Sequence, residues 1–178
     1  MPSYYTYLIS SLPLLSLGAK PPFSPDEFFE VCSRVIKNSD VEKIKDAVNN
    51  PEYTLYPKGP QLLREWRIFN LSLRSELAVL RAGRKKLDPS KYLSQGIYAP
   101  SSIVHAAMLS YRNQNILEAE RSLDLERWRF LDEVSSGHHF DIEFLIAYAL
   151  KLKILMRWDV INNADKEALF KEAINGNY

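Results

Sequence analysis

The sequence contains little of the material from which catalytic and metal sites are usually built. Among its 178 residues are one cysteine (Cys32), three histidines and six scattered glycines. A single cysteine excludes an intramolecular disulfide and a cysteine-rich zinc site, and it is compatible with the reducing cytoplasm. The glycines form no phosphate-binding or dinucleotide-binding loop, and there is no Gly-x-Ser-x-Gly turn. We therefore expect no enzyme and no bound cofactor.

An excess of charge of one sign is also missing. The chain has 23 basic and 22 acidic side chains, whereas a general nucleic-acid-binding protein shows a clear basic excess. We therefore expect no nucleic-acid partner. The composition, 46% apolar and 25% charged, is that of an ordinary globular protein. A length of 178 residues fits one domain that spans residues 1–178.

No apolar run is long enough for a transmembrane helix, which needs about 20 residues. The first apolar stretch, residues 8–17, is interrupted by Pro13, and the first basic residue, Lys20, follows it. A secretory signal has its positive charge before the apolar region, so we expect this segment to be retained. Aromatic and β-branched residues alternate with other residues over positions 5–10. That alternation predicts an extended segment within residues 1–23, packed on helices.

The remainder of the chain has the patterns of an all-α protein. Ser24 and Glu27 form a capping box, and Ser39 and Glu42 form a second one, so each pair marks the start of a helix. The predicted helices span about residues 24–38, 39–49, 60–83, 101–112, 115–135, 141–161 and 164–174. Because the gaps between them are short, we expect a single-domain bundle of about six to seven helices.

The predicted helix over residues 60–83 has two distinct faces. Its apolar face consists of Leu62, Trp66, Phe69, Leu73, Leu77 and Leu80, which are three or four residues apart. On the opposite face Arg67, Arg74 and Arg81 recur every seven residues, with Arg64 close by. Arginine is the cation best suited to protein interfaces. Arg64, Arg67, Arg74 and Arg81 are therefore candidate partner-binding residues, and a solvated helix face is the alternative.

A metal site has weak support in the sequence. His138 and His139 precede Asp141, but zinc needs three or four ligands and only His105 remains as a further imidazole. The glutamates of residues 115–135 lack the Glu-x-x-His pairs of carboxylate-bridged iron bundles. We interpret the histidines as a polar turn that caps the next helix, and the glutamates as a solvated helix face. No metal is expected.

Short motifs in the first 29 residues resemble a known signature. They are a tyrosine-rich start (4–7), Ser-Leu-Pro (11–13), Lys-Pro-Pro-Phe-Ser (20–24) and a Phe-Phe pair (28–29). This series is similar to the amino-terminal signature of an uncharacterised bacterial family whose genes lie among those of V-type ATPases. The resemblance implies that the opening residues belong to the mature cytoplasmic fold.

Two later stretches resemble the coupling subunit of V/A-type ATPases, by which we mean the one designated C in these enzymes and d in eukaryotes. They are residues 140–150 (FDIEFLIAYAL) and 65–71 (EWRIFNL), the latter followed by Arg74. The coupling subunit is an all-α protein that links the central rotor stalk to the membrane ring, binds no nucleotide and does no chemistry. It is considerably longer than 178 residues, so this chain corresponds to only a part of it.

Together the resemblances imply a non-catalytic helical adaptor of a bacterial V-type ATPase. Its expected partners are the central stalk and the membrane ring. Its expected location is the cytoplasm, peripheral at the inner membrane through the ATPase, with no membrane span of its own. The alternative is a stand-alone cytoplasmic helical scaffold or regulatory protein-interaction module that is unrelated to ATPases.

Overall fold

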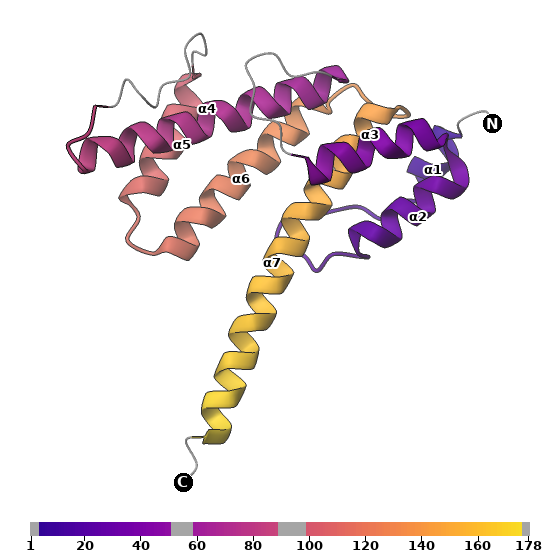
Figure 1. Ribbon diagram of the computed structural model, residues 1–178. Coiled ribbons are helices and arrows are strands. Elements are labelled where there is room, and N and C mark those ends of the chain that lie inside the picture. The colour runs from indigo at the N-terminus through magenta and orange to yellow at the C-terminus, as the bar shows by residue number, and fades with distance from the viewer. Residues whose placement is uncertain (1–3, 51–58, 89–98, 176–178) are drawn as a thin grey trace.

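The computed structural model describes residues 4–50, 59–88 and 99–175, and in these ranges the chain forms seven helices and no strand. The helices are α1 (Tyr5–Ser11), α2 (Pro25–Val35), α3 (Asn38–Asn49), α4 (Gln61–Arg84), α5 (Ser101–Arg112), α6 (Ile116–Val134) and α7 (Ile142–Asn175). The prediction of an all-α bundle is therefore confirmed (Figure 1).

The first two predicted capping boxes have different outcomes. At α2 the box is present: the Glu27 amide donates to the Ser24 hydroxyl at 3.2 Å, and the Ser24 amide donates to the Glu27 carboxylate at 2.6 Å. At α3 the prediction is wrong, because Ser39 already lies inside the helix and no side chain caps its start. The carboxylate of Asp40 instead accepts a hydrogen bond from the Tyr5 hydroxyl at 2.6 Å. This contact ties α1 to α3.

The opening segment is helical where an extended conformation was expected. Residues Tyr5–Ser11 form α1, in which the consecutive residues Leu8 and Ile9 are both buried while Tyr7 is exposed. In a strand, Leu8 and Ile9 would point to opposite faces, whereas neighbouring positions on a helix share one side. Burial of both leucine and isoleucine against the same core therefore favours the helix. The expectation of an extended segment is wrong for α1.

Helix α4 packs against α5 and α6 through the apolar face that its sequence predicts. Leu73 and Leu77 are buried, and the ring of Phe69 stacks on that of Phe130 with centroids 4.2 Å apart. Trp66 is only partly buried, because it lies at the boundary between two apolar clusters and packs against both. The α4–α5–α6 cluster thus joins the larger core around α7.

Helix α7 is the centre of the larger core. It packs against α2, α3, α4 and α6. Its fully buried side chains are Leu145, Ile146, Leu152 and Leu155. Figure 1 shows the second half of α7 extending away from the other helices. In the described ranges no helix combines the length and apolar character needed to cross a bilayer.

The predicted break between helices 141–161 and 164–174 does not occur. Helix α7 is continuous from Ile142 to Asn175. Asparagine is a weak helix former but does not break a helix as proline does. The side chain of Asn163 donates to the Asp159 carboxylate, one turn earlier, at 3.2 Å. This bond keeps the asparagine amide on the helix surface, where it does not compete with the backbone hydrogen bonds.

Candidate functional site

The four candidate arginines of α4 do not share one environment. Arg67 is only 6% exposed, and its guanidinium donates to the Asp46 carboxylate at 3.0 Å and to the Asn50 carbonyl at 3.4 Å. The expectation that Arg67 belongs to an exposed row is therefore wrong. The end of α3 lies over the first half of α4 at this point, and the spacing of residues along α4 cannot reveal that contact.

The other three arginines, Arg64, Arg74 and Arg81, are exposed, and we call them the α4 arginine row. At a rise of 1.5 Å per residue they cover roughly 25 Å of α4. Exposed Lys85 and Lys86 extend the positive charge beyond the end of the helix. Cations in the last turn of a helix are favoured by the helix dipole, but this effect does not reach the arginines further from the end.

The turn before α7 is organised by His138. Its Nδ1 lies 2.6 Å from the Asp141 carboxylate, and its Nε2 lies 3.1 Å from the Glu143 carboxylate. Asp141 also accepts from the Phe144 amide at 2.9 Å, so it caps α7 as predicted. The hydrogen bond to Asp141 and the nearby negative charges raise the pKa of His138. The neighbouring His139 is exposed.

A metal role for this turn finds no support in its geometry. Within the described part of the chain, no group of three or more His, Cys, Asp or Glu side chains is placed to hold a metal ion. Glu143 is instead occupied in fixing α4, since its carboxylate accepts from the Gln61 amide at 3.0 Å and from the Leu62 amide at 3.3 Å. The turn therefore joins the starts of two helices.

A buried carboxylate, Asp124, lies between α6 and α7. It is 2% exposed and accepts from Arg127 at 2.5 Å, from Arg157 at 3.1 Å and from the Trp158 indole at 2.9 Å. The sequence patterns led us to interpret the acidic residues of α6 as a solvated face, and Asp124 was not among the candidates. Its position, four residues before the buried Trp128, could have placed it on the inner face of α6.

Next to Asp124 lies a cavity of about 430 Å³ between α3, α4, α6 and α7. Four cationic side chains line it, and we call it the basic cavity. They are Arg67, Arg127, Lys153 and Arg157. Asp124 is the one carboxylate in the lining, and apolar side chains of α3, α4 and α7 complete the walls. The basic cavity is the strongest concentration of charge in a concave part of the described structure.

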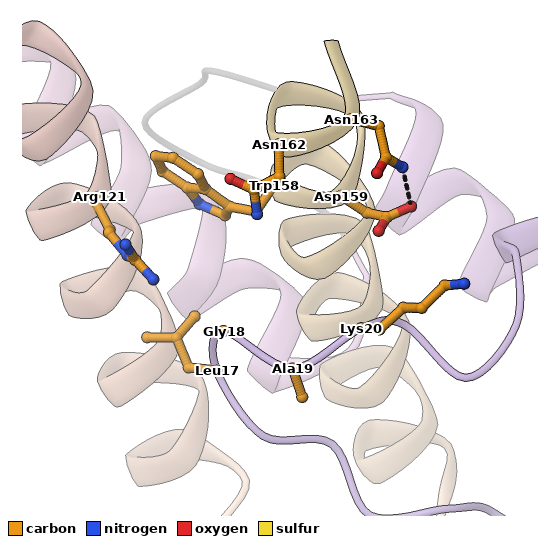
Figure 2. A pocket seen from close by; sticks show the side chains of 9 residues that line it. All are labelled: Leu17, Gly18, Ala19, Lys20, Arg121, Trp158, Asp159, Asn162 and Asn163. Atoms are coloured by element: carbon orange, nitrogen blue, oxygen red, sulfur yellow. Dashed lines mark hydrogen bonds between the residues drawn. The ribbon is translucent and has the colours of Figure 1, made fainter. Parts of the chain in front are cut away.

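A second hollow, of about 300 Å³, lies where the loop of residues 17–20 meets α6 and α7. Figure 2 shows Arg121 reaching from α6 toward Trp158 and the loop at Leu17. The Arg121 guanidinium lies 5.8 Å from the centre of the Trp158 ring, a cation–π contact. This hollow thus marks the seam along which the opening segment is held against the bundle.

Comparisons with known proteins concern the second half of the chain. A family model described as "Protein of unknown function (DUF2764)" matches residues 102–176, which covers nearly all of α5 and the whole of α6 and α7. No curated protein and no solved structure matches the chain. The matched region contains Asp124 and three of the four cations of the basic cavity, whereas the α4 arginine row lies outside it. Over α5–α7 the chain is therefore similar to this family, whose description assigns no activity.

Proposed function

We propose that the protein is a non-catalytic helical adaptor that binds a bacterial V-type ATPase, between the central stalk and the membrane ring. The observation that carries the proposal is the shape of α7. Its first half is the core of the bundle, and its second half extends away from the other helices (Figure 1). Short isolated helices are marginal in water, because most helical stability comes from packing. A partner protein that packs along the second half would stabilise it.

The choice of partner rests on the two resemblances in the sequence. The motifs of the first 29 residues and the stretches 65–71 and 140–150 resemble proteins encoded with, or forming part of, V-type ATPases. Residues 140–150 lead into and begin α7, so the stretch that resembles the coupling subunit anchors the helix we propose as the contact. The stand-alone scaffold unrelated to ATPases is the competing function.

The α4 arginine row supplies a second region suited to the same kind of partner. Exposed arginines steer an acidic protein surface into an encounter and fix its orientation. Their contribution should therefore appear chiefly in the association rate and its dependence on salt. An acidic surface of the stalk or of a ring-proximal subunit has the required complementary charge.

The test is co-purification of the chain with the stalk and ring subunits of the ATPase. One variant ends at residue 163 and so lacks the distal part of α7. A second carries Arg64, Arg74 and Arg81 changed to Glu, and its matched control carries Arg34, Lys45 and Arg129 changed to Glu. We expect the truncation to abolish co-purification, the α4 triple variant to weaken it at low salt, and the control to have little effect.

Thermal melts separate binding from folding in this experiment. Exposed charges contribute about 0–1 kcal/mol each, so both triple variants should melt close to the wild type. If the wild type fails to co-purify with any ATPase subunit, the ATPase proposal is wrong and the stand-alone scaffold is favoured. If the wild type and the truncated chain co-purify equally, the partner is right but the distal part of α7 is not the contact.

A further inference from the structure

The basic cavity holds more positive charge than the fold needs. Asp124 is satisfied by Arg127 and Arg157, and Arg157 also pairs with Glu120 at 2.8 Å. Arg67 pairs with Asp46. Three carboxylates therefore face four cations, and two of those carboxylates, Asp46 and Glu120, lie outside the lining of the cavity. Inside the cavity itself, the balance is four cations to one carboxylate.

Lys153 shows this excess most clearly. Its amine donates to the main-chain carbonyl of Val48, and among the described residues no carboxylate forms an ion pair with it. A structural lysine would be expected either to pair with a carboxylate or to extend into solvent. Lys153 instead adds a third cation beside Arg127 and Arg157, which share one carboxylate. Such like charges repel one another, and an anion between them would relieve the repulsion.

The donors are held in place before any ligand arrives. Arg127 is fixed by Asp124 on one side and by Asn70, whose side-chain oxygen accepts from its Nε at 3.4 Å. Across the described residues, no buried side-chain nitrogen or oxygen lacks a hydrogen-bond partner. Because Arg127 and Lys153 line the cavity, their N–H groups that these bonds leave over are within reach of a ligand there. Arginine presents such groups in a planar fork that matches phosphate and carboxylate oxygens.

The size and the walls of the cavity bound the ligand. A volume of about 430 Å³ lies in the range of small-molecule sites, which are typically 300–1,000 Å³. Trp66, Leu150 and Ile154 provide apolar wall opposite the charged groups. Clefts lined by charge of one sign within low-dielectric walls concentrate counter-ions. A single chloride would leave most of this space empty.

We propose that the basic cavity binds a small multivalent oxyanion, carrying phosphate groups or several carboxylates. The anion occupies the space between Arg127, Lys153 and Arg157, with Arg67 at the α3 side. Asp124 orients the two α6 and α7 arginines from beneath and does not itself contact the anion. This site is independent of the ATPase contact, since it lies within the bundle and away from the distal half of α7.

The test is isothermal titration of the full chain with pyrophosphate, with citrate as the carboxylate arm and with sodium chloride at equal ionic strength as the blank. We expect saturable binding of one anion per chain for at least one of the two probes, and the tighter probe identifies the ligand chemistry. The double variant Arg127→Gln/Lys153→Gln should bind at least tenfold more weakly. The matched control Arg129→Gln/Lys20→Gln removes one arginine and one lysine outside the cavity and should bind within twofold of the wild type.

Folding of the variants is checked by thermal melt without ligand. Since Arg127 also pairs with Asp124, the single variant Lys153→Gln provides a version of the test that leaves the Asp124 contacts intact, and it should weaken binding several-fold. The proposal is overturned if the wild type binds neither probe beyond the chloride blank. It is equally overturned if the control variant loses as much affinity as the cavity variant, because the binding would then reflect only overall charge.

Discussion

The imidazole of His138 lies 3.1 Å from the carboxylate of Glu143, and that carboxylate also accepts the first free amides of α4. A neutral imidazole has one N–H and could donate to only one of its two carboxylate neighbours. The protonated ring donates to both Asp141 and Glu143. One proton on His138 therefore links the turn before α7 to the start of α4.

We predict that this link makes stability depend on pH. Its hydrogen bond to Asp141 raises the pKa of His138 in the folded state, so the contribution is complete below the unfolded value of about 6.5 and is lost as the pH rises through the folded value. Urea unfolding at pH 5.5 and pH 8.5 should show wild type more stable than His138→Gln at the lower pH and nearly equal to it at the higher.

His139→Gln is the control for this experiment, because His139 is exposed beside His138. The pH dependence of the control should follow that of the wild type. On the acid side, burial favours the neutral form of Asp141, but the hydrogen bonds from His138 and the Phe144 amide lower its pKa overall. The contribution of Asp141 is thus present above about 3.9 and lost as the pH falls. A His138→Gln difference that grew toward pH 8.5 would contradict this account.

Arg67 and Arg74 should respond differently to the same charge reversal. Arg67→Glu would place a carboxylate beside Asp46 at a 6% exposed position, and we expect it to lower the free energy of unfolding by about 2–3 kcal/mol. Arg74 is exposed, so Arg74→Glu should change it by less than about 1 kcal/mol. Urea denaturation measures both. Equal effects of the two substitutions would mean that the Arg67–Asp46 pair does not contribute to the fold.

The difference between these two arginines also shows what local sequence patterns can and cannot predict. The seven-residue spacing correctly placed Arg74 and Arg81 on a surface of α4, and the apolar spacing correctly identified Leu73 and Leu77 as buried. The same spacing failed at Arg67, because burial there is imposed by α3, which is distant in sequence. Periodicity reports the faces of one helix but not which of its turns another helix will cover.

The errors at the two ends of the chain have related causes. In residues 5–10 the alternation of residue types favoured an extended segment, yet Leu8 and Ile9 are buried together in α1. At Asn162 and Asn163 two polar residues favoured a break, yet α7 continues. In both places weak local preferences were overridden, by packing in the first and by the continuity of a long helix in the second.

Removal of the Asp124 carboxylate should destabilise the protein strongly. Asp124 is 2% exposed and holds Arg127, Arg157 and the Trp158 indole. Asp124→Ala leaves these donors without their acceptor, and breaking a buried charge pair costs about 3–5 kcal/mol. The control Asp132→Ala removes a carboxylate of the same helix that is 57% exposed and pairs with Lys151, at a cost of about 0–1 kcal/mol. A thermal melt in which the two variants are alike would contradict the structural role of Asp124.

The hydroxyl and the ring of Tyr148 should contribute separately to holding the opening segment. The hydroxyl donates to the Pro13 carbonyl at 2.8 Å, and the ring lies 5.3 Å from that of Phe28. Tyr148→Phe keeps the ring and loses one hydrogen bond, at a cost of about 1 kcal/mol. Tyr148→Ala also leaves a cavity and should cost about 3–5 kcal/mol.

The readout that separates these effects is hydrogen exchange over residues 12–24, together with urea denaturation. Tyr148→Phe should accelerate exchange in this segment more than in α4, since only the contact to Pro13 is lost. The control Tyr7→Phe changes a ring that is 72% exposed and should alter neither measurement. If Tyr148→Phe costs as much as Tyr148→Ala, the hydroxyl rather than the packed ring dominates, and the aromatic contact with Phe28 is not what anchors the opening segment to α7.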